Sequence, residues 1–130
     1  MNTFGVTLQI CGLSPHQASH FLDVPPRVVA RWMRGVGRPT VEALAALGDL
    51  QARQQNVADA IITSWDEAGR PASLAITVAR DDDQAREMGW PSLAAQIAPA
   101  AIAQTVLGPI SIELDHGAVA EVDAATIAAE

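Results

Sequence analysis

The sequence has no lysine, a single cysteine and no apolar run long enough to cross a bilayer. The lone thiol, Cys11, excludes an internal disulfide, as is typical of proteins from a reducing compartment. The first ten residues lack the basic region of a secretory signal. The abundance of alanine beside the absence of lysine indicates a GC-rich coding bias. We therefore expect a cytoplasmic protein with no membrane partner.

The formal net charge of −7 argues against a nucleic-acid partner if the chain is taken whole. The charge is unevenly divided, however. Residues 1–53 carry five arginines and three acids, a balance of +2, whereas residues 54–130 carry three arginines and twelve acids, a balance of −9. This asymmetry predicts separate tasks for the two halves, and only the first half is suited to phosphate.

Capping signals divide the first part of the chain into short helices. Ser14 before Pro15 is typical of an N-cap followed by proline in the first turn. Pro25-Pro26 begins another helix for the same reason, and Gly35 ends it. The sequence thus predicts helices over residues 3–11, 15–22 and 26–34.

Thr40 caps a further helix, whose length is open. Apolar residues keep a helical period on both sides of Gly48, but glycine in a helix interior costs about 1 kcal/mol relative to alanine. We therefore expect either one long helix or two helices that meet near Gly48. In both cases Gly69-Arg70-Pro71 ends the segment, so residues 1–69 are predicted to form the first domain.

The apolar period changes in residues 70–130. Alternating apolar residues predict strands over 74–78 and 110–114, with a short acidic helix over 81–87 between them. An alanine-rich helix over 92–106 is expected to be interrupted at Pro99. Two strands cannot bury their faces alone, so they must pack on a helix or on a second copy of the chain. The predicted class is mainly α with a small α/β part: four to five helices, then a two-strand plus helix dimerisation domain.

The segment Pro25–Gly35, PPRVVARWMRG, concentrates positive charge on one helix. Two short helices joined by a tight turn form the helix-turn-helix arrangement. The spacing of Val29 and Trp32 directs both toward the core, whereas Arg27, Arg31 and Arg34 are spaced i, i+4, i+7 and share the opposite face. Such a face fits the major groove of DNA.

The residues Leu13–Gly35, LSPHQASHFLDVPPRVVARWMRG, resemble the Cro/CI-type (Xre) helix-turn-helix family and align with it without a gap. Residues 40–50 fit the helix that follows in that family. The resemblance implies a sequence-specific DNA-binding domain. The family's typical elements are matched by Leu13-Ser14, Leu22 through Val24, Pro26-Arg27, Val29, Arg31-Trp32 and Gly35.

The chain departs from this family at three positions. Asp23 replaces the glycine of the turn, and aspartate tolerates a positive φ better than most residues. Pro15 stands where the family often has a glutamine that touches phosphate, so His16 or Gln17 would have to make this contact. Pro25 replaces the usual serine cap of the recognition helix and cannot cap it with a side chain.

The whole chain is more weakly similar to anti-CRISPR-associated autorepressors and related small phage or bacterial regulators. This resemblance rests on the order of elements and on the segment GWPSLAAQIAPA. In that family the second half is a dimerisation domain. This resemblance implies a homodimeric autorepressor that binds an inverted-repeat operator in double-stranded DNA. When bound, such a protein is associated with the nucleoid.

Specific roles follow for the basic residues. Arg27 and Val28 are expected to read bases, Arg31 to read bases or reach phosphate, and Arg34 and Arg38 to clamp the backbone. The alternative is an antitoxin-like or adaptor protein whose C-terminal half binds a protein partner. The candidate DNA-binding residues are His16, Gln17, Pro26, Arg27, Val28, Arg31, Arg34 and Arg38.

Other chemistry has weaker support in the sequence. His16 and His20 are spaced i, i+4, but HQASH lacks the glutamate of the HExxH zinc pattern and a third ligand. The acids at 81–83 are explained more simply as helix-capping residues. Cys11 lies in an apolar stripe, which favours a buried thiol. We expect no enzyme, no cofactor and no metal.

Overall fold

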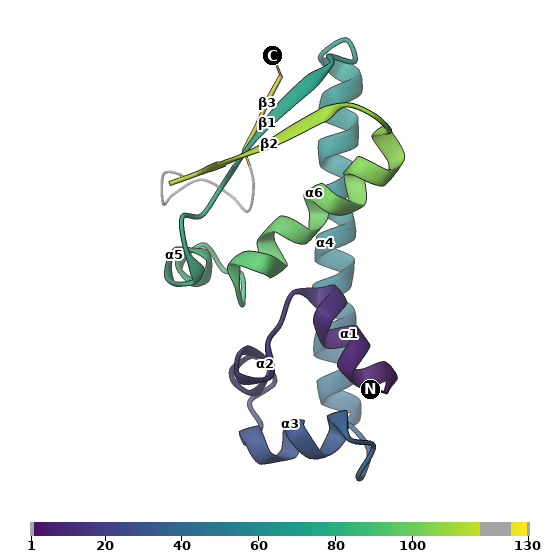
Figure 1. The fold of residues 1–130 in the computed structure, drawn as a ribbon, viewed down its shortest axis with the longest axis vertical. Coiled ribbons are helices and arrows are strands. Elements are labelled where there is room, and N and C mark those ends of the chain that lie inside the picture. Colours follow the sequence, from purple (N-terminus) through teal and green to yellow (C-terminus); the bar gives the residue numbers. More distant parts are fainter. Residues whose placement is uncertain (1, 118–125, 130) are drawn as a thin grey trace.

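The computed structural model describes residues 2–117 and 126–129. The molecule is elongated and built along one long helix, α4 (Val41–Glu67) (Figure 1). Three short helices, α1 (Thr3–Cys11), α2 (Pro15–Leu22) and α3 (Pro26–Met33), gather around the first half of α4. A small sheet with helices α5 (Asp82–Glu87) and α6 (Leu93–Leu107) lies beside its second half. The predicted class, mainly α with a small α/β part, is confirmed.

The helix starts follow the capping residues. The hydroxyl of Ser14 accepts a hydrogen bond from the backbone N–H of Gln17 at 3.1 Å, and the Gln17 side chain accepts one from the N–H of Ser14 at 2.9 Å. This reciprocal pair is a capping box. Thr40 caps α4 in the same way through the N–H of Ala43. Pro25 precedes α3 without a side-chain cap, as expected.

Helix α4 is continuous across Gly48, which resolves the question that the sequence left open. Gly48 is exposed, and no atom lies within 4 Å of the place where a Cβ would be. Its neighbours Leu47 and Leu50 are buried in the core. Packing of that apolar face therefore outweighs the intrinsic cost of one glycine.

The sheet has three strands in the order β2-β1-β3. The central strand β1 (Ser73–Val78) pairs in parallel with β2 (Ser111–His116), and Leu74 lies opposite Ile112. On its other side β1 pairs antiparallel with β3 (Thr126–Ala129). The two expected strands are therefore present and paired, and β3 is an additional strand that was not predicted. The third strand has four residues, too few for a clear alternating pattern.

Helix α6 runs without interruption through Pro99, so the expected break there was wrong. Proline cannot donate the hydrogen bond that residue 99 of a helix gives to the carbonyl oxygen of Ala95. The side-chain amide of Gln54 on α4 donates to that carbonyl oxygen at 3.1 Å instead. A side chain from another helix thus replaces the missing backbone donor.

Two clusters of buried residues stabilise the molecule. The larger one joins α1, α2, α3 and the first half of α4 to Trp90 and Ala95. The second lies between the sheet and the helices α4 and α6, where the inward side chains of β1 meet Ile61 and Ala103. The first cluster draws residues from both sides of the expected boundary after residue 69. In the described part of the chain, no helix combines the length and apolarity needed to span a membrane.

Candidate nucleic-acid interface

Helix α3 lies across one end of the molecule, at the opposite end from the sheet (Figure 1). Val29 is fully buried, and Trp32 is 7% exposed, so both residues hold α3 on the core as their spacing predicted. The Trp32 ring meets Phe4 of α1 edge to face, with 5.6 Å between ring centroids. The side-chain amide of Asn2 donates to the carbonyl oxygen of Trp32 at 2.6 Å. The orientation of α3 is therefore fixed by packing and by a hydrogen bond at its C-terminal end.

A tight turn joins α2 to α3. Asp23 adopts the left-handed conformation with a φ of 55°, as expected for its place in the turn. The backbone N–H of Val24 donates to the carbonyl oxygen of Ser19 at 3.1 Å, and the Ser19 hydroxyl donates to the carbonyl oxygen of Val24 at 2.6 Å. Ala18 of α2 is fully buried in the core cluster that also contains Val29 of α3. These contacts hold α2 and α3 at a fixed angle.

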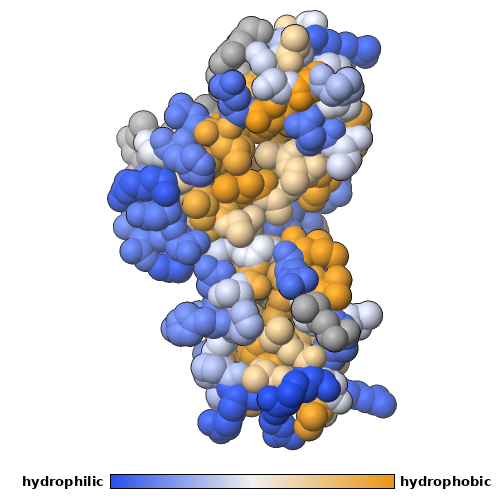
Figure 2. Space-filling model, in the orientation of Figure 1, coloured by the Kyte–Doolittle hydropathy of each residue, from blue (hydrophilic) through white to orange (hydrophobic). Residues whose placement is uncertain are grey.

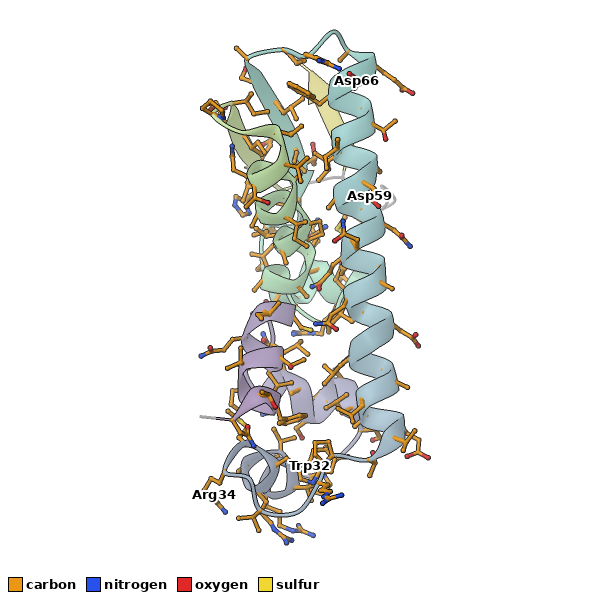
Figure 3. The ribbon with its side chains drawn as sticks, turned by 90° about the vertical axis from the view of Figure 1, so that its right-hand side faces the viewer. Trp32, Arg34, Asp59 and Asp66 are labelled. Carbon is orange, nitrogen blue, oxygen red and sulfur yellow. The ribbon has the colours of Figure 1, made fainter. Side chains whose placement is uncertain are left out.

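Four arginines surround the exposed side of α3. Arg27 and Arg31 lie on the helix, Arg34 is its C-cap, and Arg38 lies in the following loop; all four are exposed. Figure 3 shows Arg34 at the end of the molecule, with Asp59 and Asp66 far from it along α4.

None of these four arginines forms an ion pair with a described residue. Ion pairs elsewhere among the described residues join Arg70 to Asp66, Arg80 to Asp81 and Arg86 to Asp83. An exposed guanidinium without an internal partner keeps its full donor set for phosphate or base edges. The end of the molecule around α3 is thus a cationic surface, which we call the α3 surface (Arg27, Arg31, Arg34 and Arg38).

The remaining predicted contact residues differ in their availability. Pro26 and His16 are exposed, whereas Val28 is half-buried and packs against the larger core cluster. Gln17 is half-buried, and its side-chain oxygen is used in the capping box. Only the side-chain amide nitrogen of Gln17 remains free to donate to a phosphate.

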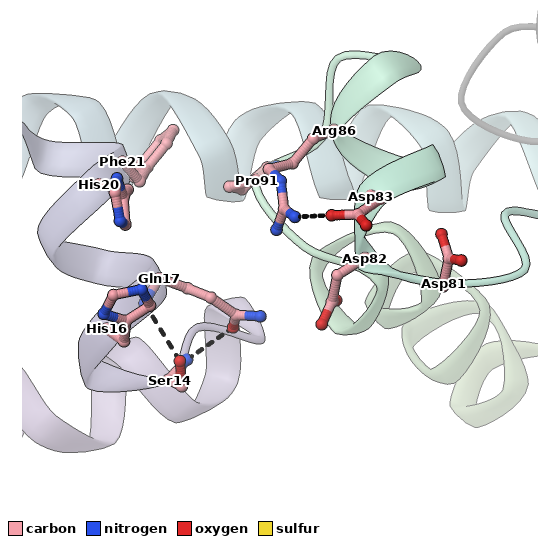
Figure 4. Close-up of a pocket in the computed structure, with 10 residues that line it drawn as sticks. All are labelled: Ser14, His16, Gln17, His20, Phe21, Asp81, Asp82, Asp83, Arg86 and Pro91. Carbon is pink, nitrogen blue, oxygen red and sulfur yellow. Dashed lines mark hydrogen bonds and ion pairs between the residues drawn. The ribbon is translucent and has the colours of Figure 1, made fainter.

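A cleft of about 770 Å³ separates α2 from α5 (Figure 4). His16 and His20 line one wall, and the acids at 81–83 line the other, where Asp83 is paired with Arg86. The rings of the two histidines lie edge to face, with 4.7 Å between centroids. No group of three His, Cys, Asp or Glu residues in the described segments is arranged to hold a metal ion.

The acids of this cleft and the lone thiol have structural roles. The Asp81 side chain caps α5 by accepting from the N–H of Gln84 at 2.8 Å, and Asp82 accepts from the N–H of Leu93 at the start of α6. The first of these contacts agrees with the capping role expected from the sequence. Cys11 is fully buried, and burial raises the pKa of its thiol above the ordinary value of 9.0. It is therefore a core residue rather than an activated nucleophile.

The residues that join the two halves were not predicted from the sequence. The guanidinium of Arg53 lies 3.7 Å from the centre of the buried Trp90 ring and donates to the carbonyl oxygen of Gly89 at 2.5 Å. The hydroxyl of Ser92 donates to the carbonyl oxygen of Gly12 at 2.6 Å. These pairs are at least 36 residues apart, so no local pattern reveals them.

Comparison with family models, with curated proteins and with solved structures finds no match to this chain. No relative therefore supplies a fold name or an activity. A function for the chain must therefore be inferred from its own geometry and charge.

Proposed function

We propose that residues 1–69 form a helix-turn-helix domain with α3 as recognition helix, in a homodimeric DNA-binding repressor. The observation that carries this proposal is the α3 surface: four exposed arginines at one end of an acidic protein, none of them in an ion pair with a described residue. A net-acidic chain whose described carboxylates leave these four arginines unpaired offers a site for an external anion. DNA offers regularly spaced phosphates and base edges to a helix of this kind.

The rigid attachment of α3 supports a role in reading sequence. Trp32, Val29 and the Asn2 contact fix the helix on the core, so its outward side chains are presented in one geometry. Arg27, in the first turn, is placed to reach base edges, where an arginine gives bidentate contacts to guanine. Arg34 and Arg38, beyond the end of α3, are placed to hold the backbone.

A single module of this size makes few base contacts. Two copies related by a two-fold axis double them and require an inverted repeat whose half-sites lie about 34 Å apart, one turn of the double helix. Such a protein is expected in the cytoplasm of a bacterium or in a phage-infected cell, where it represses transcription, its own gene included. The acidic second half is expected to repel DNA and keep only the α3 surface against it.

Fluorescence anisotropy with a labelled random-sequence duplex tests the cationic contact. We expect wild-type affinity to fall with salt and the variant R27A/R31A/R34A/R38A to have a shallower salt dependence. The logarithm of the association constant falls linearly with the logarithm of the salt concentration, and each lost phosphate contact makes this slope shallower by about 0.9. The matched control is Arg70→Ala, which removes an exposed arginine that is paired with Asp66 at the far end of α4.

Two results would overturn the assignment. Equal binding of the fourfold variant and the wild type would show that the α3 surface does not meet DNA. An equal loss in Arg70→Ala would show that the effect comes from net charge rather than from the position of the arginines.

A further inference from the structure

The segment from Met88 to Ile112 contains no charged side chain, although acids flank it on both sides at Glu87 and Glu113. Most of it is helix α6, whose inner side is buried in the second core cluster. Its outer side carries no charge and is largely apolar, with Thr105 as an exposed polar residue. Val106 is 64% exposed, Ala101 is exposed, and Ile97 and Ile102 are half-buried.

Strand β2 extends this apolar surface. Ile112 and Leu114 point to the same side of the sheet as the buried residues of β1, yet both are only half-buried. Figure 2 shows hydrophobic side chains over α6 and beneath β2, on the side of the molecule that faces the viewer. We call this surface the α6–β2 flank (Ile97, Ala101, Ile102, Val106, Ile112 and Leu114). Strand β2 is also an edge of the sheet, and exposed edges are normally covered.

The charges around the α6–β2 flank favour a second copy of the chain over a membrane as its binding partner. Residues 54–130 have a balance of −9, so two copies repel each other wherever their acids meet. The flank is where two copies can approach through uncharged side chains. An anionic membrane is disfavoured, because surface-binding helices need lysine or arginine beside the apolar face, and α6 has neither.

The position of the flank also fits a two-fold assembly. The α6–β2 flank lies along the side of the elongated molecule, whereas α3 lies at its end (Figures 1 and 2). Copies joined side to side around an axis along the length of α4 present both α3 helices at the same end. One continuous duplex can then meet both helices.

From these observations we infer that the α6–β2 flank is the homodimer interface and that its occupant is the same flank of a second copy. This inference rests on the proposed repressor function, which requires two DNA-binding modules. An isologous contact of this kind buries Val106, Ala101 and the half-buried side chains of both copies. It also covers the edge of β2 that pairs with no described strand.

Sedimentation velocity of the full chain, without DNA, tests the interface. We expect the wild type to be a dimer and Ala101→Arg to raise the dimer dissociation constant at least about tenfold, because each copy would bury an unpaired charge. Val106→Arg, at an exposed position, is a second variant with the same expected effect. The matched control is Ala60→Arg, an exposed alanine on α4 outside this flank, which should leave the dimer intact. Circular dichroism checks that each variant is folded.

A monomeric wild type, or folded Ala101→Arg and Val106→Arg variants that dimerise like wild type, would overturn the inference. The result is independent of DNA binding. If the flank variants are monomers while the α3 arginines prove dispensable for DNA, the interface stands and the repressor function fails. If the α3 arginines are needed for DNA binding while the flank variants remain dimers, the DNA-binding function stands and the proposed interface fails.

Discussion

The side-chain amide of Gln54 donates a hydrogen bond to the carbonyl oxygen of Ala95, the backbone acceptor that Pro99 leaves without its helical donor. The same amide donates to the carbonyl oxygen of Cys11 at 3.0 Å, in the last turn of α1. Gln54 is 2% exposed. One buried side chain of α4 therefore satisfies the open backbone acceptors of two other helices and ties the first half of the chain to the second.

Replacing Gln54 with leucine removes both donors without leaving a large cavity. We expect a loss of about 1–3 kcal/mol in the free energy of unfolding, because two buried carbonyl oxygens lose their partner. Urea titration followed by circular dichroism measures it. The control is Gln55→Leu, which removes only an exposed contact with Asp59 and should change stability little. Equal stabilities of the two variants would contradict this role for Gln54.

Gly12 and Gly48 are expected to respond to alanine in opposite directions. A Cβ on Gly12, which has a φ of 80°, would lie 2.5 Å from the backbone nitrogen of Ala95, so Gly12→Ala must separate α1 from α6 or distort both. We expect a destabilisation of about 1–3 kcal/mol. Gly48→Ala meets open space inside a helix and should stabilise by about 0.5–1 kcal/mol. Thermal unfolding compares the two, and a stable Gly12→Ala variant would refute the close approach.

The helix starts and the α2–α3 turn could be predicted because their causes are local. Ser14 and Thr40 cap the helices they precede, and Asp23 takes the left-handed conformation expected for the turn. The exposure of the α3 arginines followed from helical spacing in the same way. A helix end or turn can be predicted when the residues that cause it lie within three or four positions of it in the sequence.

The features that the sequence did not reveal have non-local causes. Pro99 looked like a helix break because its compensating donor, Gln54, is 45 residues away in sequence. The half-burial of Val28 depends on the core against which α3 packs. Gly48 lies inside a helix because Leu47 and Leu50 on either side of it pack in the larger core cluster. The strand pairing, with β2 parallel to β1, depends on the path of α5 and α6 between them.

The thiol of Cys11 should be inert in the native protein. It is fully buried, and burial raises its pKa above 9.0, so the native protein holds the neutral thiol at pH 8. We expect no reaction with a disulfide reagent until urea unfolds the chain. This preference for the thiol stabilises the native state below pH 9.0, and the contribution is lost as the pH rises from 9.0 through the raised pKa. Fast labelling under native conditions would contradict this account.

Arg27 and Arg38 should affect DNA binding in different ways. Arg27→Ala is expected to weaken binding to the operator by about 1–3 kcal/mol and to relax specificity, because it removes a base contact. Arg38→Ala should weaken binding to operator and random duplex alike, because it removes a phosphate contact. Titration of both variants against both duplexes measures the difference. Equal losses of each variant on the two duplexes would refute these separate roles.

Footprinting on the DNA upstream of the protein's own coding region tests the central claim most directly. Two α3 helices on one dimer should protect an inverted repeat with half-sites about 34 Å apart, and Arg27→Ala should need at least about fivefold more protein for the same protection. Such a footprint would establish the target, the pairing of modules and autoregulation together. The account would be contradicted if the footprint showed no protected repeat at a wild-type concentration that saturates random DNA.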